Sequence, residues 1–313
     1  MSMWQDAPDG SNRTLRMKYD AIIIGGGFAG LAAATYLARA RRSVLVVDTG
    51  RPRNRFAAAS HGSLGHEGTN PLKILAAARD QFLAYRAAHI VEVAASAAHV
   101  HEDGFSVRLE NDEQVEARKL VLAFGLQDNL PDIPGLQERW GKTVLNCPTF
   151  HRIGFSGREL GVLYRVPMSV HQALLVAEWG PTTLYLNGAT LEESEAAKLA
   201  LRGVTVEAAR VNKLIGDGAA LAAVQLEGRR PRAIDAFYIL PQPCLSSPLG
   251  DQLGVDMDDG PLGPLIRTDA NKMTSIPGLY AAGDIAQVSH SVSWAVADGV
   301  TAGTSAHQAL VFG

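Results

Sequence analysis

The stretch Tyr19-Asp20-Ala21-Ile22-Ile23-Ile24-Gly25-Gly26-Gly27-Phe28-Ala29-Gly30 decides the fold. Its apolar run, residues 19–24, predicts a buried strand, and the glycines that follow predict a tight turn. An alanine- and leucine-rich pattern over Gly30–Arg39 then predicts a helix, and Ser43–Val47 predicts a second buried strand. The order is strand, glycine turn, helix, strand, which is the beginning of a parallel α/β sheet.

The spacing Gly25-x-Gly27-x-x-Gly30 gives each glycine a physical role. The first permits the tight turn, the second lets the backbone approach a pyrophosphate, and the third lets the helix pack closely on the strand. The helix then offers unpaired N–H groups to phosphates. Asp48 ends the next strand 18 positions after Gly30, where its carboxylate can accept hydrogen bonds from ribose hydroxyls. We therefore predict a dinucleotide site at this turn, and the predicted site also includes Phe28, Ala29 and Thr49. The alternative is a glycine turn that binds no ligand.

Composition narrows the class of protein. The 313 residues carry a formal net charge of −3 and include only two cysteines, which argues against nucleic-acid binding and against a disulfide framework. The scarcity of cysteine fits a reducing cytosol, so we expect a cytoplasmic protein. Residues 1–16 are polar and lack the apolar core of a signal peptide, so we expect a loose tail. The uncharged stretch Ala21–Ala38 follows the strand, turn and helix pattern and is not expected to span a membrane. The histidines show no metal-ligand spacing, so no metal site is expected.

A second strand–helix–strand pattern lies in the middle of the chain. Glu159–Leu163 predicts a strand, Val170–Glu178 a helix and Thr183–Leu186 a strand. Connections rich in proline lie on both sides of this region. Further predicted elements are a helix over Pro71–Ala87, a strand opening at Val115, another strand over Lys119–Ala123, and a last helix from about Ser293 to Leu310. We predict an α/β fold of two Rossmann-like nucleotide-binding domains, of the three-layer ββα type, with the second inserted into the first.

The segment Pro277-Gly278-Leu279-Tyr280-Ala281-Ala282-Gly283-Asp284 suits a close approach of backbone to a flavin's phosphate and ribityl chain. With this segment and the glycine turn, the chain resembles the thioredoxin-reductase-like group of FAD oxidoreductases, class II pyridine nucleotide-disulfide oxidoreductases. Similar stretches are Asp48…Arg53-Asn54, His61-Gly62…Gly68, Leu130–Gly135 and Ser169–Ala173.

The resemblance implies bound FAD, homodimers, an FAD domain split between residues 17–130 and 245–313, and an inserted pyridine-nucleotide domain over residues 131–244. It also implies that the start of the last helix faces the flavin. His290 is one candidate there, and Trp294 is either a flavin contact or part of a dimer interface. The residues expected to contact FAD through this resemblance are Arg53, Asn54, Gly125, Gly283, Asp284, Trp294 and Ala295.

The chain departs from that family at its redox-active pair of cysteines. The matching stretch is Cys147-Pro148-Thr149-Phe150-His151, in which Phe150 replaces the second cysteine. A dithiol pair needs one sulfur to attack and another to resolve the mixed disulfide, so disulfide reductase activity of the usual kind is not expected. Cys147 is either a single nucleophile whose pKa His151 lowers, or a buried thiol without a role.

The second nucleotide turn also departs from the family. After the strand at residues 159–163 the chain reads Leu163-Tyr164-Arg165-Val166-Pro167-Met168-Ser169, without glycine. The side chains of Tyr164 and Val166 should obstruct a pyrophosphate. Between Arg165 and Lys198 there is no cationic residue to meet a 2′-phosphate. We therefore do not expect NADPH to bind in the usual manner. NADH is only slightly more compatible with this turn, so its binding is not expected either.

Three functions remain open. The first is an FAD-dependent oxidase that takes electrons directly from a small substrate, with thiols as one substrate class. In the second, a redox protein such as ferredoxin reduces the flavin. The third is a flavin-binding regulatory module without turnover. The intact first site beside two altered partner sites favours the first, because a flavin half-reaction can run when the substrate is itself the reductant.

Overall fold

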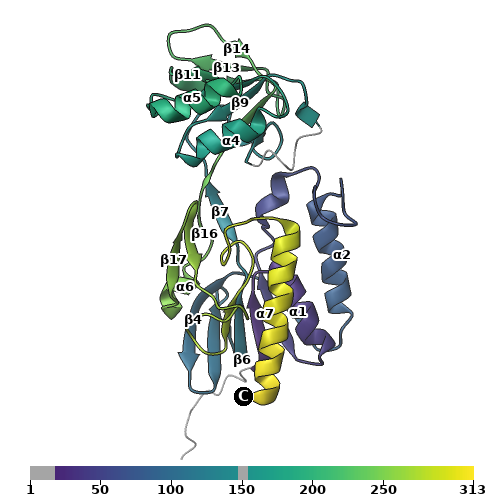
Figure 1. The fold of residues 1–313 in the computed structure, drawn as a ribbon. Helices are drawn as coiled ribbons and strands as arrows, with labels where there is room; N and C mark the ends of the chain where they lie inside the picture. Colours follow the sequence, from purple (N-terminus) through teal and green to yellow (C-terminus); the bar gives the residue numbers. More distant parts are fainter. Residues whose placement is uncertain (1–17, 147–153) are drawn as a thin grey trace, which may run out of the picture.

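The computed structural model describes residues 18–146 and 154–313. It consists of two α/β units joined by two extended segments, one unit above the other in Figure 1. The tail predicted over residues 1–16 and the candidate residues Cys147 and His151 lie outside the described part. No helix within the described ranges is long and apolar enough to cross a membrane.

The first unit is built on a seven-stranded sheet of order β3-β2-β1-β6-β5-β4, in which β19 also pairs with β6. The predicted strand–turn–helix–strand is present, since β1 and β2 pair in parallel with α1 between them. One prediction was wrong: the strand opening at Val115 and the one predicted over Lys119–Ala123 are a single long strand, β6, which ends at Leu122 and runs past its partner β5 to pair with β1. The strands are β1 (Lys18–Ile24), β2 (Val44–Asp48), β3 (Ala88–Glu92), β4 (Ala95–His101), β5 (Gly104–Leu109), β6 (Gln114–Leu122) and β19 (Leu279–Ala281).

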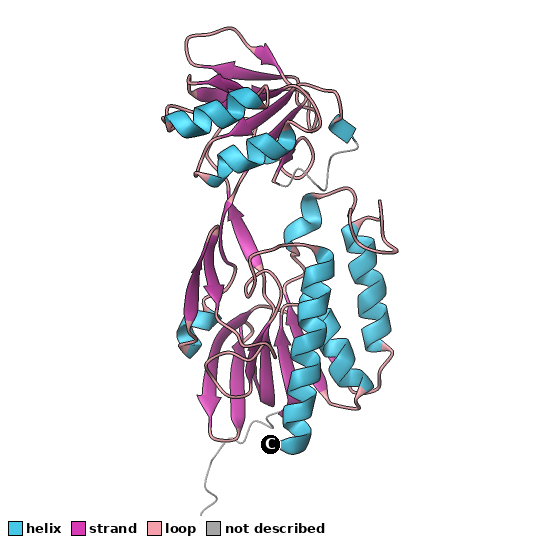
Figure 2. Ribbon diagram, viewed as in Figure 1, coloured by secondary structure: helices cyan, strands magenta, loops and turns pink. Residues whose placement is uncertain are grey.

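The long helices of this unit lie beside the sheet (Figure 2). They are α1 (Phe28–Arg39), α2 (Pro71–Leu83) and α7 (Val292–Phe312). The prediction that the second helix continues to Ala87 was wrong, because the chain turns after Leu83 so that β3 can enter the sheet beside β2. Helix α7 packs on α1 through glycines: a Cβ at Gly299 would lie 2.1 Å from the carbonyl oxygen of Ala29.

The second unit is inserted between β6 and β19 of the first, as predicted. Its five-stranded sheet has the order β11-β10-β9-β15-β8. A three-stranded sheet, β12-β13-β14, packs against it, so that Val211 and Val224 share a core with Leu163 and Phe237. Its elements are η2 (Gln137–Arg139), β8 (Val144–Leu145), β9 (Leu160–Leu163), α4 (Met168–Val176), β10 (Thr182–Tyr185), α5 (Glu193–Leu201), β11 (Thr205–Glu207), β12 (Val211–Ile215), β13 (Ala223–Leu226), β14 (Arg232–Ala233) and β15 (Ala236–Ile239).

The two connections between the units pair with each other. Strand β7 (Leu126–Asn129) leads into the inserted unit and β16 (Gln242–Leu245) leads out of it, and they form an antiparallel ladder in which Asn129 faces Gln242 and Leu126 faces Leu245. The remaining elements belong to the first unit: η1 (Arg53–Phe56), α6 (Leu249–Leu253), β17 (Met257–Gly260) and β18 (Gly263–Ile266).

Candidate functional site

The three glycines of the first turn differ in what surrounds them. Gly25 has a φ of +104°. A Cβ there would lie 2.4 Å from the carbonyl oxygen of Ala123, and one at Gly30 would lie 1.8 Å from that of Gly25. Both glycines are therefore required by the fold itself. A Cβ at Gly27 would meet no protein atom within 4 Å. The space beside Gly27 is open, as it must be if a pyrophosphate is to approach this backbone.

The start of α1 lies beside that open space and has no capping side chain. Gly27 is the residue that precedes the helix, and no side chain caps the first N–H groups. The first turn of an α-helix leaves its N–H groups without partners inside the helix, and its dipole favours negative charge. Gly27, Phe28, Ala29 and Gly30 therefore provide backbone donors suited to a phosphate.

Asp48 lies at the end of β2, next to the turn. A Cβ at Gly26 would lie 2.7 Å from the Oδ2 atom of Asp48, so the carboxylate lies directly against the glycine segment. Arg79 on α2 contacts the same oxygen of Asp48 at 3.3 Å. Arg79 also pairs with Glu92, at 2.6 Å. The structure thus brings the predicted phosphate-binding and ribose-binding groups together, with the exposed Thr49 following them.

Gly283 and Asp284 come from the far end of the chain to the same place. Gly283 has a φ of +82°, and a Cβ there would lie 2.9 Å from the Cβ of Ala29 on α1. Its N–H donates to the buried carboxylate of Asp298, which Lys272 pairs with at 2.8 Å. Only glycine fits this backbone against α1. Ala295 lies within 3.9 Å of the same Cβ position, whereas the Trp294 side chain is 56% exposed.

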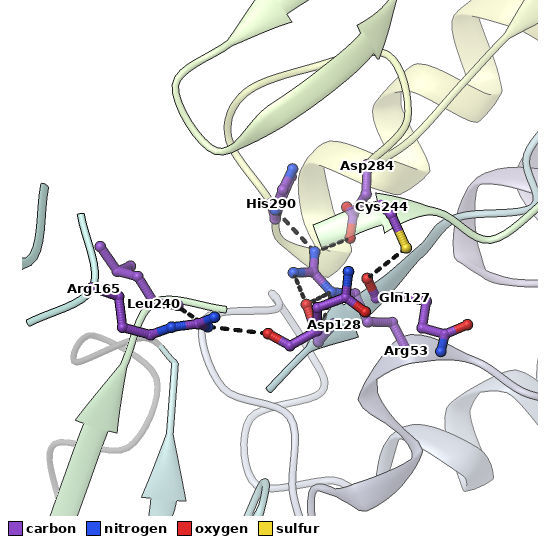
Figure 3. A network of polar contacts seen from close by, with 9 residues as sticks. Arg53, Gln127, Asp128, Arg165, Leu240, Cys244, Asp284 and His290 are labelled. Carbon is purple, nitrogen blue, oxygen red and sulfur yellow. Dashed lines mark hydrogen bonds and ion pairs between the residues drawn. The ribbon is translucent and has the colours of Figure 1, made fainter. Parts of the chain in front are cut away.

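Arg53 is the centre of a polar network that the sequence did not predict (Figure 3). Its guanidinium pairs with Asp128 at 2.6 Å and with Asp284 at 2.9 Å, and it contacts the Nδ1 atom of His290 at 2.9 Å. Burial alone would lower the pKa of Arg53, but the hydrogen bonds and charges of Asp128 and Asp284 outweigh it and raise that pKa. The cation therefore joins η1, β7 and the segment before α7 in one cluster.

His290 has a defined tautomer in this network. Arginine has no acceptor atom, so the contact requires that Nδ1 of His290 accept and that the ring proton lie on Nε2. Burial lowers the pKa of His290, Asp284 opposes the shift and Arg53 adds to it. Nε2 is buried. A backbone hydrogen bond with Gln287 also opposes the lowering of the pKa, but burial outweighs it and favours the neutral ring.

Two further predicted residues border this region. Asn54 belongs to η1, and its carbonyl accepts from the N–H of Ala57 at 3.0 Å. Gly125, with a φ of +75°, follows β6, and its carbonyl accepts from Ser246 at 3.1 Å. A Cβ at Gly125 would meet no atom within 4 Å. Asn54 thus follows the carboxyl end of β2 and Gly125 follows that of β6, the sheet edge at which such folds bind their ligands.

The corresponding turn of the inserted unit is built differently. Between β9 and α4, the hydroxyl of Ser169 accepts from the N–H groups of Arg165 and Val166 at 3.1 and 3.4 Å. The Arg165 side chain extends to the connecting strands, and Tyr164 packs against the core of the unit. Groups that would face a phosphate in an open turn are thus engaged within the protein, and the first turn of nearby α5 carries Glu193 and Glu195.

Cys244, the described cysteine, lies in β16, where its thiol donates to the carbonyl of Gln127 at 3.7 Å. It belongs to the connection between the units, next to the Arg53 network (Figure 3). The structure therefore gives Cys244 a local partner, and its relation to Cys147 lies outside the described residues.

The two-unit fold and the glycine turn at Gly25–Gly30 are those of a Rossmann-type oxidoreductase. Residues 19–163 match the family model described as pyridine nucleotide-disulphide oxidoreductase. The chain is 31% identical to "Thioredoxin reductase tcpT" of Claviceps purpurea over 93% of its own length and 94% of that protein. It is similar to a solved oxidoreductase from Agrobacterium tumefaciens (40% identity, TM-score 0.90, covering 95% of this chain and 99% of that one). It is also similar to HlmI (34% identity, TM-score 0.88, covering 93% and 92%).

The chain therefore belongs to the pyridine nucleotide-disulphide oxidoreductase family and is an enzyme of the thioredoxin-reductase-like type. The family resemblance and the fold class predicted from the sequence are confirmed.

Proposed function

We propose that this protein is an FAD-dependent oxidase that takes electrons directly from a small thiol substrate, without NADPH. The observation that carries the proposal is the contrast between the two turns. The first turn is open at Gly27, whereas in the second the N–H groups of Arg165 and Val166 already donate to the hydroxyl of Ser169. One turn is thus suited to a dinucleotide and the other is not.

The residues of the first unit fit FAD. Gly27 and the uncapped start of α1 would hold the pyrophosphate, Asp48 would accept from the ribose of the adenosine, and Asp284 would accept from the ribityl hydroxyls. Arg53, held by Asp128 and Asp284, would place a fixed positive charge in this region. The order of these groups along the carboxyl edge of one sheet supports a single extended dinucleotide.

The reaction balances with molecular oxygen as the electron acceptor. Two thiols of the substrate lose two protons and two electrons as a sulfur–sulfur bond forms, and oxygen takes both protons and both electrons to become hydrogen peroxide. Bound FAD would supply the redox chemistry by carrying the electron pair from the first half-reaction to the second. The protein binds and orients the substrate, and its cations stabilise negative charge as electrons arrive.

The candidate catalytic residues, the oligomeric state and the cellular location are also proposals. Cys147 and His151 are the candidate thiol and its base, with a thiol that has no role as the alternative. A homodimer and a cytoplasmic location are proposed from the family resemblance. A redox protein as electron donor remains the second candidate, since Phe150 removes the resolving cysteine that relatives with paired cysteines use.

The test is an aerobic survey of small monothiols and dithiols with the FAD-loaded protein, in which hydrogen peroxide and the oxidised substrate are both measured. We expect equal amounts of peroxide and disulfide for the accepted dithiol. Cys147→Ser in the same assay separates a nucleophilic thiol from a passive one. If reduced ferredoxin reduces the flavin while every thiol fails, the oxidase proposal is wrong and the protein-donor alternative is right.

A further inference from the structure

Arg165 uses its side chain to hold both connections between the two units. Its Nη1 atom donates to the backbone carbonyls of Asn129 at 3.0 Å and of Leu240 at 3.1 Å, and its Nη2 atom donates to the side chain of Gln242 at 3.3 Å. Asn129 and Gln242 face each other as the last pair of the β7–β16 ladder. A single guanidinium from the inserted unit therefore binds both strands at the point where they reach that unit.

Arg53 holds the adjacent residue of the same strand from the other unit. Asp128 precedes Asn129 on β7, and its carboxylate is 9% exposed and accepts from Arg53 at 2.6 Å. Figure 3 shows the two guanidinium groups on opposite sides of this short segment. Hydrogen bonds between charged and neutral groups are among the stronger ones in proteins, and the planar guanidinium has several fixed donors. Two successive residues of one strand are thus tied to different units.

The units also touch directly beside this strand. Gly141 of the inserted unit packs against η1, where a Cβ would lie 2.8 Å from the Cβ of Phe56 and 3.3 Å from its carbonyl oxygen. Phe56 ends the short helix that contains Arg53. The packing contact and the ion pair with Asp128 therefore come from the same rigid turn, so a rotation about the connecting strands would break both.

We infer that Arg165 and Arg53 form a clamp on the β7–β16 connection, and that this clamp fixes the inserted unit in one orientation against the first unit. A turn that could have bound a nucleotide thus contributes a tether between the units. A swing of the inserted unit about the connecting strands would cost the bonds by which Arg165 holds both of them.

The test is the rate at which a disulfide forms between engineered cysteines at Phe56 and Gly141, followed with the FAD-loaded protein. The double variant Phe56→Cys/Gly141→Cys places two thiols across the contact. Gly141 has a φ of +73° and a Cβ there would lie 2.8 Å from the Cβ of Phe56, so the cysteine adds strain, which is the same in both backgrounds. Circular dichroism first establishes that the double variant is folded in each background. The rate is compared between Arg165→Ala and the matched control Arg158→Ala. The Arg158 side chain is 59% exposed and pairs with Asp235 at 3.3 Å within the inserted unit. Peptide mapping identifies the link between residues 56 and 141 in the monomer band.

We expect the link to form about 10-fold more slowly with Arg165→Ala than with Arg158→Ala, since an unclamped unit spends less time in contact. Arg165→Lys, which keeps the charge but not the three-way geometry, should fall between them. Hydrogen exchange of the β7 and β16 amides should rise with Arg165→Ala while that of β9 and β10 stays unchanged. Equal disulfide rates in the two backgrounds would overturn the clamp, and so would exchange that rises equally in β9 and β10, because that result means unfolding of the unit.

Discussion

Replacing Gly27 by alanine separates the binding role of the first turn from its structural role. Gly27 has a φ of −76°, which any residue adopts, and its missing Cβ would meet no protein atom within 4 Å. Alanine at this position before a helix costs about 1 kcal/mol or less. We therefore expect Gly27→Ala to fold, with an unfolding midpoint close to that of the wild type.

The effect on FAD should be much larger. The added methyl group occupies the space beside the N–H groups at the start of α1 and moves the pyrophosphate away from at least one of them. A hydrogen bond to a charged group contributes about 1.5–3 kcal/mol, which corresponds to a roughly 10- to 150-fold weaker Kd for FAD. Gly30→Ala serves as the contrasting variant: its Cβ would lie 1.8 Å from the carbonyl oxygen of Gly25, so this protein should fail to fold stably.

The assay is titration of the apoprotein with FAD, followed by quenching of flavin fluorescence, together with thermal unfolding by circular dichroism. Wild-type affinity in a folded Gly27→Ala protein would refute the assignment of the pyrophosphate to this turn. Loss of folding in Gly27→Ala would refute the claim that the space beside Gly27 belongs to the ligand.

Two other predictions concern stability. The pKa of His290 is lowered in the folded protein, so the unfolded chain takes up its proton first, and His290 contributes stability that is lost as the pH falls below roughly 6.5. His290→Asn keeps an acceptor for Arg53 without the titration, so the unfolding free energy from urea melts should fall less between about pH 8 and 5.5, and a slope equal to wild type would contradict this. Lys272→Met should cost about 3–5 kcal/mol because it leaves the buried carboxylate of Asp298 unpaired. The exposed Lys198→Met is its control, and a cost equal to that of the control would contradict the pairing.

The backbone features of the site could be predicted because each depends on a local requirement. Gly25 and Gly27 precede a helix and Gly30 lies in its first turn, at a fixed spacing, and Asp48 ends the next strand. These signals lie within one supersecondary unit, so the sequence alone is enough to place them together.

The network around Arg53 could not be predicted, because its members are separated by up to 237 positions in the chain. Asp128 shows no motif, and only the three-dimensional path of β7 brings it to Arg53. The orientation of Trp294 depends on which side of α7 faces α1, and one residue of helical rotation puts Ala295 inward and Trp294 outward. Its contact with FAD stays a prediction.

The second turn was predicted to be obstructed by Tyr164 and Val166. The structure shows a different reason why the turn offers few groups to a phosphate. The backbone N–H of Arg165 donates to the hydroxyl of Ser169, and the Arg165 side chain binds the connecting strands. The sequence indicated missing glycines, but a side chain's long-range partners are not readable from it.

The most direct measurement mixes the FAD-loaded protein anaerobically with NADPH, and separately with the dithiol accepted in the aerobic survey, while the visible absorbance of oxidised flavin is recorded. We predict that the dithiol removes this absorbance within the time of one turnover and that equimolar NADPH leaves it unchanged. Rapid loss of the absorbance with NADPH would contradict the central claim that the inserted unit's turn is closed to a nicotinamide cofactor.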